Sequence, residues 1–135
     1  MSIGFTGTQQ GMTHWQCDAV LQLLSELKPS KVGHGDCIGS DQQFHQMVKW
    51  GFPHIFIYGH PPKNPSKRAF CHFDYLYPEK DYLDRNKDIA EKYDIIIATP
   101  KEDEEVLRSG TWSTVRYAKK LGKKVYIVKQ DGSVE

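Results

Sequence analysis

The stretch Asp94-Ile95-Ile96-Ile97-Ala98-Thr99-Pro100 decides the fold of this chain of 135 residues. Its apolar residues follow one another without the alternation that is typical of a strand with one solvated face. Such a run is typical of a strand that is buried on both faces, as in a parallel sheet with helices on each side. We therefore predict a mainly parallel sheet in which residues 94–99 form one strand, which Pro100 ends.

Predicted strands and helices alternate on both sides of this run. The expected strands are residues 3–6, 31–34, 54–58, 94–99 and 124–128, and the expected helices are residues 12–27, 40–51, 81–93 and 110–121. The sequence shows no internal repeat and no linker. We predict an α/β fold, a single Rossmann-like domain over residues 1–135, with a mainly parallel five-stranded sheet, helices on both faces and a polar tail at 130–135.

Local patterns support two of the helix starts and one long connection. Thr13 with Gln16 and Ser40 with Gln43 each have the spacing of a capping box. Residues 59–78 contain several prolines and are too polar for a core element, so they are predicted as a loop. Loops of this length within a compact domain are usually functional or disordered.

Composition limits the classes of function. The chain has 18 basic and 17 acidic residues and a formal net charge of +1, so no overall field attracts DNA or an acidic membrane. No apolar stretch approaches the roughly 18 residues that span a bilayer. The start of the chain lacks the features of a signal peptide. Three cysteines without CxxC spacing predict free thiols, and we expect a cytoplasmic protein.

Three turns rich in glycine, threonine and serine carry the functional signal. They lie at residues 7–11, 33–40 and 108–112, and each one follows an apolar run and precedes a predicted helix. A strand, a small-residue turn and a helix N-terminus present free N–H groups and a partial positive charge, which favour phosphate. In open parallel sheets, ligands bind at the carboxyl ends of the strands. The three turns therefore predict one anionic, nucleotide-like ligand.

Five segments stand in a characteristic order along the chain. They are Gly4-Phe5-Thr6-Gly7-Thr8-Gln9, Gly35-Asp36-Cys37-Ile38-Gly39-Ser40-Asp41, His60-Pro61-Pro62, Tyr82-Leu83-Asp84-Arg85-Asn86 and Ser109-Gly110-Thr111-Trp112-Ser113-Thr114. Together they resemble the SLOG superfamily, which groups Rossmann-like proteins similar to DNA-processing protein A, to the LOG phosphoribohydrolases and to small nucleotide-binding domains. The resemblance implies a nucleotide, a nucleotide derivative or a nucleic-acid end bound at the strand tips. It also implies a homo-oligomer, most simply a dimer.

The chain departs from the LOG-like hydrolases at their PGGxGTxxE turn. Aligned on Gly110-Thr111, it has Thr114 where the catalytic Glu of that turn would stand, and Arg108-Ser109 where Pro-Gly would stand. Hydrolysis of an N-glycosidic bond would then need another carboxylate. Asp36 and Asp41 are the candidates, because both lie on the second glycine-rich turn and are expected to face the ligand.

Each aspartate also has a structural interpretation. Asp41 could cap the helix that begins near Ser40, and Asp36 could form a turn hydrogen bond. The predicted ligand-binding residues are Gly7, Thr8, Gln9, Gly35, Gly39, Ser40, His60, Arg85, Asn86, Arg108, Ser109, Gly110, Thr111 and Thr114. Among them, Arg108 could clamp a phosphate with its guanidinium, and the role of Arg85 rests mainly on the resemblance.

The long loop offers two further alternatives. Its histidine and aromatic side chains could stack on a nucleobase, or they could pin the loop to the body or form a subunit contact. His60, Cys71 and His72 lack a recurrent zinc spacing, so no metal ligand is predicted.

The sequence therefore predicts a module that binds a nucleotide or nucleotide-derived ligand, as a sensor or a sequestering protein, without a cofactor. The alternative is an N-glycoside hydrolase of a nucleoside monophosphate that releases base and ribose phosphate, with Asp36 or Asp41 as the acid or base. Binding of nucleic acid is disfavoured by the near-neutral charge.

Overall fold

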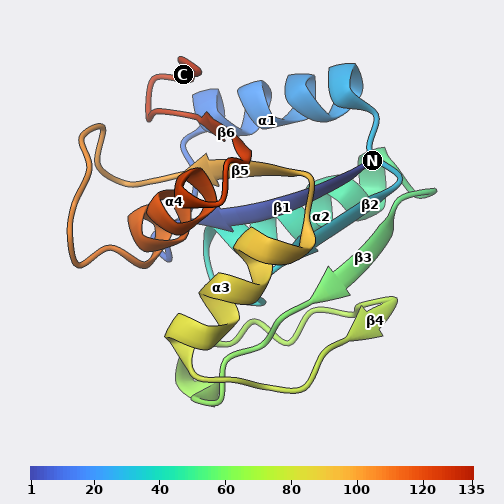
Figure 1. Ribbon diagram of the computed structural model, residues 1–135. Helices are drawn as coiled ribbons and strands as arrows, with labels where there is room; N and C mark the ends of the chain where they lie inside the picture. Colours follow the sequence, from blue (N-terminus) through green and yellow to red (C-terminus); the bar gives the residue numbers. More distant parts are fainter.

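Six parallel strands form the centre of the molecule (Figure 1). The computed structural model describes residues 1–135. The strands are β1 (Ser2–Gly7), β2 (Lys31–His34), β3 (Phe56–Gly59), β4 (Tyr75–Leu76), β5 (Ile95–Thr99) and β6 (Lys124–Ile127). Their order across the sheet is β4-β3-β2-β1-β5-β6, and all neighbours pair in parallel. The Rossmann-like α/β fold with a parallel sheet is confirmed.

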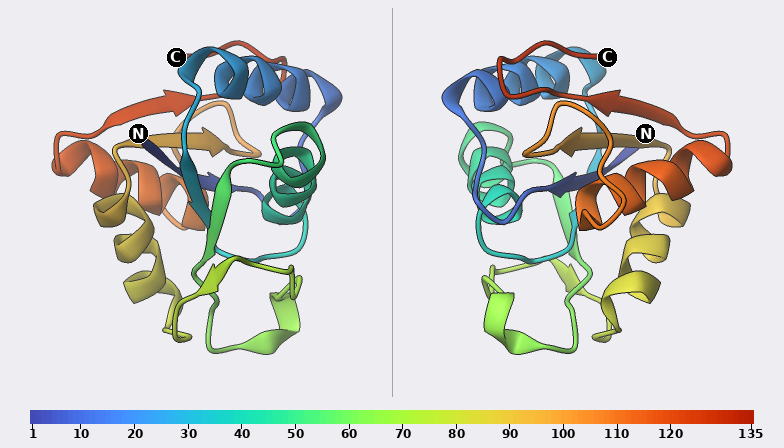
Figure 2. Two further views of the ribbon diagram at one scale, coloured as in Figure 1. Left: turned by 90° about the vertical axis from the view of Figure 1, so that its right-hand side faces the viewer. Right: turned by 90° about the vertical axis from the view of Figure 1, so that its left-hand side faces the viewer.

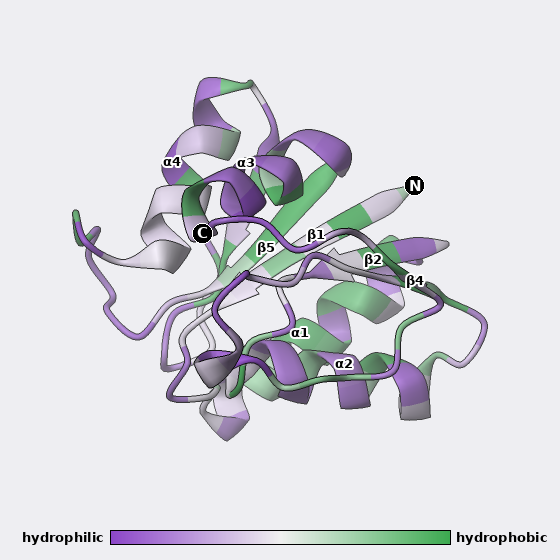
Figure 3. Cartoon of the chain, turned by 90° about the horizontal axis from the view of Figure 1, so that it is seen from below, coloured by the Kyte–Doolittle hydropathy of each residue, from purple (hydrophilic) through white to green (hydrophobic).

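Four helices cover the two faces of this sheet. They are α1 (His14–Leu27), α2 (Ser40–Gly51), α3 (Tyr82–Lys92) and α4 (Gly110–Lys120). The helices α1 and α2 lie on one face and α3 and α4 on the other (Figure 2). The isoleucine run of β5 serves both faces, because Ile97 packs in the cluster with α1 and α2 while Ile96 packs against α3. Figure 3 shows the apolar residues gathered in the central strands.

The sheet has one strand more than the five that were predicted. Strand β4 lies within the segment 59–78, which was predicted as a loop, and it pairs with β3 through Tyr58 and Tyr75. A strand of two residues is too short to show a periodic pattern, so no sequence pattern could predict it. The same segment contains the short 3₁₀ helix η1 (Pro65–Lys67).

One predicted capping box is confirmed and the other is wrong. Thr13 caps α1 and exchanges hydrogen bonds with Gln16, as its spacing indicated. At α2 the N-cap is Gly39, and Ser40 Oγ instead donates to the carbonyl of Thr8 at 2.6 Å. Gln43 Oε1 accepts the N–H of Met12 at 2.6 Å. These side chains therefore tie the start of α2 to the turn between β1 and α1.

The last residues of the chain fold back along β6. The backbone of Ile127 exchanges two hydrogen bonds with Glu135, at 2.9 and 3.2 Å. Val128 and Val134 form an antiparallel bridge, and Lys129 Nζ lies 2.9 Å from Glu135 Oε1. The segment 130–135, expected as a polar tail, thus forms a turn against the outer edge of the sheet. None of the helices is both long enough and apolar enough to cross a membrane.

Candidate functional site

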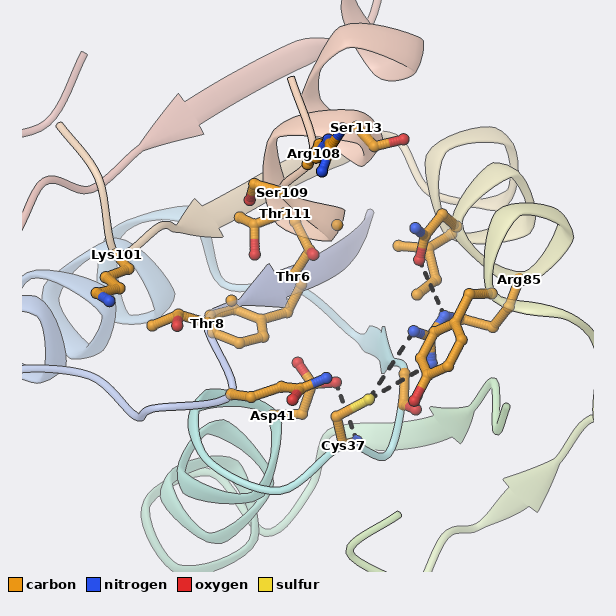
Figure 4. Close-up of a pocket in the computed structure, with 18 of the residues that line it drawn as sticks. Thr6, Thr8, Cys37, Asp41, Arg85, Lys101, Arg108, Ser109, Thr111 and Ser113 are labelled. Atoms are coloured by element: carbon orange, nitrogen blue, oxygen red, sulfur yellow. Dashed lines mark hydrogen bonds between the residues drawn. The ribbon is translucent and has the colours of Figure 1, made fainter. Parts of the chain in front are cut away.

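A cavity of about 750 Å³ lies at the carboxyl ends of β1 and β5 (Figure 4). At this point the strand order reverses, because the chain continues from β1 to β2 on one side and reaches β5 on the other. Turns that leave neighbouring strands in opposite directions open a crevice between them, which is where open α/β sheets bind ligands. The volume suits a small-molecule ligand, for which pockets measure about 300–1,000 Å³.

The structure brings most of the predicted site residues to this cavity. Those that line it are Gly7, Thr8, Gln9, Gly35, Asp41, Arg85, Asn86, Arg108, Ser109, Gly110 and Thr111. They come from the turn after β1, the turn before α2, helix α3 and the start of α4. The predicted residues outside the lining are Asp36, Gly39, Ser40, His60 and Thr114.

The start of α4 presents unused donors to the cavity. Ser109 caps the helix and accepts the N–H of Trp112 at 3.2 Å. The N–H groups of Gly110 and Thr111 have no acceptor within the chain. A Cβ atom on Gly110 would meet nothing closer than Asn86 Nδ2 at 4.0 Å. Open amides, the Ser109 hydroxyl and the helix dipole together form a place that suits an anion.

Arg85 supplies a buried positive charge. Arg85 is 6% exposed, and its Nη1 donates to the carbonyls of Gly35 at 2.6 Å and His60 at 3.2 Å. Its Nε donates to Asn86 Oδ1 at 3.0 Å. No carboxylate pairs with it, and Nη2 reaches only Cys37 Sγ at 3.8 Å. Buried charges are normally paired, so this guanidinium favours an anionic or strongly polar group in the cavity.

Asp41 is a buried carboxyl on the opposite side of the cavity from α4. Its Oδ2 accepts the N–H of Cys37 at 3.1 Å, and its Oδ1 has no hydrogen-bond partner although it is buried. Burial raises the pKa of Asp41 to about 7, and the charge of Arg85 and the nearby backbone N–H groups of Cys37 and Gly35 oppose part of that rise. The N-cap of α2 is Gly39, and the carboxyl of Asp41 accepts from Cys37, which precedes the helix. Asp41 therefore does not cap α2.

The expectation that Asp36 faces the cavity is wrong. Its carboxylate is fully buried and accepts two hydrogen bonds from the long loop, from Arg68 Nε at 2.7 Å and from the N–H of Cys71 at 2.9 Å. Asp36 itself has a positive φ of 55°, which turns the carboxylate toward that loop. Its turn therefore anchors a distant segment of the chain.

The other predicted residues outside the lining have structural roles. Gly39 has a φ of 86°, and a Cβ atom there would meet the backbone of Gln9. Thr114 Oγ1 donates to the carbonyl of Gly110 at 3.1 Å. His60 Nε2 lies 2.7 Å from the hydroxyl of Tyr93, and burial lowers the pKa of His60 to about 4. These three residues support the walls of the cavity from behind.

The aromatic rings of the long loop divide into packed and exposed ones, since Phe70 and Tyr75 are 59% and 49% exposed. His60 and Tyr77 stack with their ring centroids 4.6 Å apart, and Phe73 contacts His34 and His45. None of the rings of residues 60–77 lines the cavity. Phe73 therefore pins the loop to the body, and a subunit contact through the exposed rings stays a prediction.

Several lining residues were not identified from the sequence. They are Phe5, Thr6, Gln10, Cys37, Tyr82, Leu83, Ile89, Lys101, Glu102, Leu107 and Ser113. Lys101 and Leu107 belong to the loop that follows β5. Because this loop starts at the carboxyl end of a strand, the sequence could have predicted that it borders the ligand site. Arg116 holds this loop by donating to Glu105 Oε2 at 2.9 Å and to the carbonyl of Leu107 at 2.9 Å.

The three cysteines are free, as predicted. Cys71 does not join His60 and His72 but lies near His34 and His45, with the possible ligand atoms of these three residues within 4.8 Å of one another. His34 Nδ1 accepts the N–H of Asp36, so the proton of this ring is on Nε2, which faces His45 Nδ1 at 2.9 Å. A protonated Nε2 has no lone pair for a metal. His34 therefore donates a hydrogen bond to His45, and Cys71 lies beside this pair.

Comparisons with known proteins identify the fold. No protein-family model and no curated protein sequence matches the chain. A molybdenum cofactor binding protein from the phototrophic bacterium Rippkaea orientalis has a similar structure, with a TM-score of 0.73 and 22% identity over 96% of this chain and 77% of that protein. The structure of the structural genomics target TM1055 is also similar, with a TM-score of 0.67 and 17% identity over 92% of this chain and 71% of the TM1055 chain. The chain shares the Rossmann-like fold of these two proteins.

Proposed function

We propose that this protein binds a small phosphate-bearing, nucleotide-like ligand in the cavity at the ends of β1 and β5. The observation that carries the proposal is the pair of unused N–H groups at Gly110 and Thr111, which open to the cavity at the start of α4. Two such donors on a helix N-terminus match the oxygens of a phosphate group. The function that follows is that of a sensor or a sequestering module for this ligand.

The charges around the cavity support an anionic ligand. Three basic side chains line it, those of Arg85, Lys101 and Arg108, against two acidic ones, those of Asp41 and Glu102. Asp41 is only partly ionised at neutral pH, because burial raises its pKa to about 7. The lining therefore has an excess of positive charge, which attracts a phosphate ester more strongly than a neutral solute.

The structural comparison agrees with capture of a small ligand. The similar protein from Rippkaea orientalis is described as a molybdenum cofactor binding protein. Because the identity is 22%, the comparison supports this kind of function only through the shared fold. The assignment to the SLOG superfamily stays a prediction, as do a homo-oligomeric state and a cytoplasmic location.

A second candidate function is hydrolysis of the N-glycosidic bond of a nucleoside monophosphate. The observation in its favour is Asp41, a carboxyl that lines the cavity and has a pKa of about 7, which suits a general acid or base. Glu102 is the other carboxyl of the lining. Asp36 does not take part in this hypothesis, because Arg68 and the Cys71 amide occupy its carboxylate.

One experiment tests both candidates. The purified protein is incubated with inorganic phosphate, ribose 5-phosphate and a panel of nucleoside mono-, di- and cyclic phosphates, and thermal stability and released base are measured on the same samples. A phosphate-bearing ligand should raise the melting temperature, and unreacted nucleotides would identify a binding module. Release of base would identify a hydrolase. No stabilisation by any of these compounds would contradict the phosphate site.

A further inference from the structure

Asp41 Oδ1 is an acceptor that the proposed phosphate site does not use. It is buried, it has no hydrogen-bond partner, and it belongs to a residue that lines the cavity. A buried acceptor without a partner destabilises the folded protein relative to one that is satisfied. A ligand that donates a hydrogen bond to this oxygen would remove that cost on binding.

A donor lies on the same side of the cavity. Arg85 Nη2 carries two hydrogens, and its one hydrogen bond is the long one to Cys37 Sγ at 3.8 Å. Cys37 in turn donates its N–H to Asp41 Oδ2. Asp41 and Arg85 therefore lie on either side of Cys37, and each has a polar atom, Oδ1 or Nη2, that can bond to a ligand. A hydroxyl group can donate to the first and accept from the second, as the hydroxyls of sugars do.

These groups face the start of α4 from the other side. In Figure 4, Asp41 and Cys37 lie on one wall of the cavity and Ser109 and Thr111 on the wall across from it, with Thr6 between them. The cavity thus has two polar ends of different character, one of open amides and one of a carboxyl and a guanidinium. A sugar phosphate has two matching ends, its phosphate and its ring hydroxyls.

We propose that Asp41 is a specificity residue, whose free oxygen accepts a hydroxyl of the sugar part of the ligand while its phosphate lies at the start of α4. This inference rests on the proposed function, because the phosphate end sets the orientation of the ligand. It adds that the cavity selects sugar phosphates over simple phosphate esters. Arg85 Nη2 donates to the oxygen of the same sugar edge.

The test compares two phosphate monoesters that differ in their hydroxyls, methyl phosphate and ribose 5-phosphate. Their dissociation constants are measured by titration calorimetry with the unchanged protein and with Asp41→Asn, which keeps the size of the side chain. The exposed Asp84→Asn is the control for the loss of one acidic group. Should Asp41→Asn not fold, Asp41→Ser replaces it in the same comparison.

We expect ribose 5-phosphate to bind the unchanged protein more tightly than methyl phosphate. Asp41→Asn should weaken ribose 5-phosphate by about tenfold, as for one lost hydrogen bond to a buried group, and leave methyl phosphate within about threefold. Equal binding of the two esters by the unchanged protein, or an equal loss of both in the variant, would overturn the specificity role. A protein that binds neither ester would overturn the phosphate site itself, and the inference with it.

Discussion

Asp36 Oδ2 lies 2.7 Å from Arg68 Nε, whereas Asp41 Oδ1, five residues later in the first turn of α2, has no hydrogen-bond partner. The Asp36 carboxylate forms an ion pair with Arg68 and accepts the N–H of Cys71, so it holds the long loop. Asp41 lines the cavity. Two aspartates that looked equivalent in the sequence therefore have separate roles, one in the stability of the fold and one at the ligand site.

Asp36→Asn should destabilise the protein by about 3 kcal/mol, because it leaves the Arg68 guanidinium beside a neutral group in a largely buried place. Denaturation by urea, followed by circular dichroism, measures the free energy of unfolding. Limited proteolysis should cut the loop around residues 68–71 faster than in the unchanged protein. Asp84→Asn, at an exposed position, is the control. A variant of unchanged stability that loses a ligand-dependent activity would contradict the structural role of Asp36.

Gly110→Val should abolish binding of inorganic phosphate while the fold stays intact. The added side chain meets no protein atom closer than 4.0 Å from its Cβ position, and it would occupy the space in front of the Gly110 and Thr111 amides. We expect a melting temperature close to that of the unchanged protein and an affinity for phosphate reduced by at least about tenfold, the loss of one charge-assisted hydrogen bond. Gly51→Val, at a site with nothing within 4 Å, is the matched control. Unaltered phosphate binding by Gly110→Val would place the anion elsewhere.

Arg85→Lys should lower both stability and the affinity for ribose 5-phosphate, whose sugar contacts Arg85 in the proposed orientation. An ammonium group is a single point, so it cannot donate to the Gly35 carbonyl, the His60 carbonyl and Asn86 Oδ1 in the geometry of the guanidinium. Buried carbonyls left unpaired cost about 1–3 kcal/mol each. Urea denaturation and calorimetric titration with ribose 5-phosphate measure the two effects. Lys119→Arg, at an exposed position in the last turn of α4, should leave the affinity for ribose 5-phosphate unchanged. Equal effects of the two substitutions would argue against a role of Arg85 in binding.

Asp41 should make stability depend on pH in a defined direction. Burial raises the pKa of Asp41 to about 7 in the folded protein, against about 3.9 in the unfolded chain. The folded state holds this proton more tightly, so the stabilisation is complete below about pH 4 and is lost as the pH rises to about 7. Burial lowers the pKa values of His34 and His60. These two groups therefore make stability rise with pH over part of this range, opposite to the effect of Asp41.

The contribution of Asp41 therefore appears in a difference between two proteins. Asp41→Asn should gain stability relative to the unchanged protein as the pH rises from about 4 to 7, by at most about 1.4 kcal/mol per pH unit. Urea denaturation at a series of pH values measures this difference. A difference that is constant over the range would show that Asp41 keeps an ordinary pKa.

The parts of the fold that the sequence could predict depend on local or repeated signals. The isoleucine run of β5 indicated burial on both faces, and Ile96 and Ile97 do lie in clusters on opposite faces of the sheet. The capping box of Thr13 and Gln16 closes within one turn of helix, so its spacing determines it. Ser40 and Gln43 have a similar spacing, but their side chains bond to the turn after β1, which no local pattern reveals.

The site was predictable to the extent that it follows strand ends. The turns after β1 and before α4 lie at the cavity because parallel strands all end on the same side of the sheet. Which side chains of a turn point inward depends on backbone dihedral angles and on distant partners. Asp36, with its positive φ and its bond to Arg68, shows both effects. The unpaired state of Arg85 likewise becomes visible only when its neighbours are placed in space.

The two borders of the sheet limit how copies of this chain can associate. One border is β4, which offers only two residues, and the other is β6, where the backbone of Ile127 is already bonded to Glu135. Neither border leaves a long row of free N–H and C=O groups, which is the template for adding a strand from another molecule. The short β4 and the folded-back last residues therefore disfavour growth of the sheet by strands of other molecules.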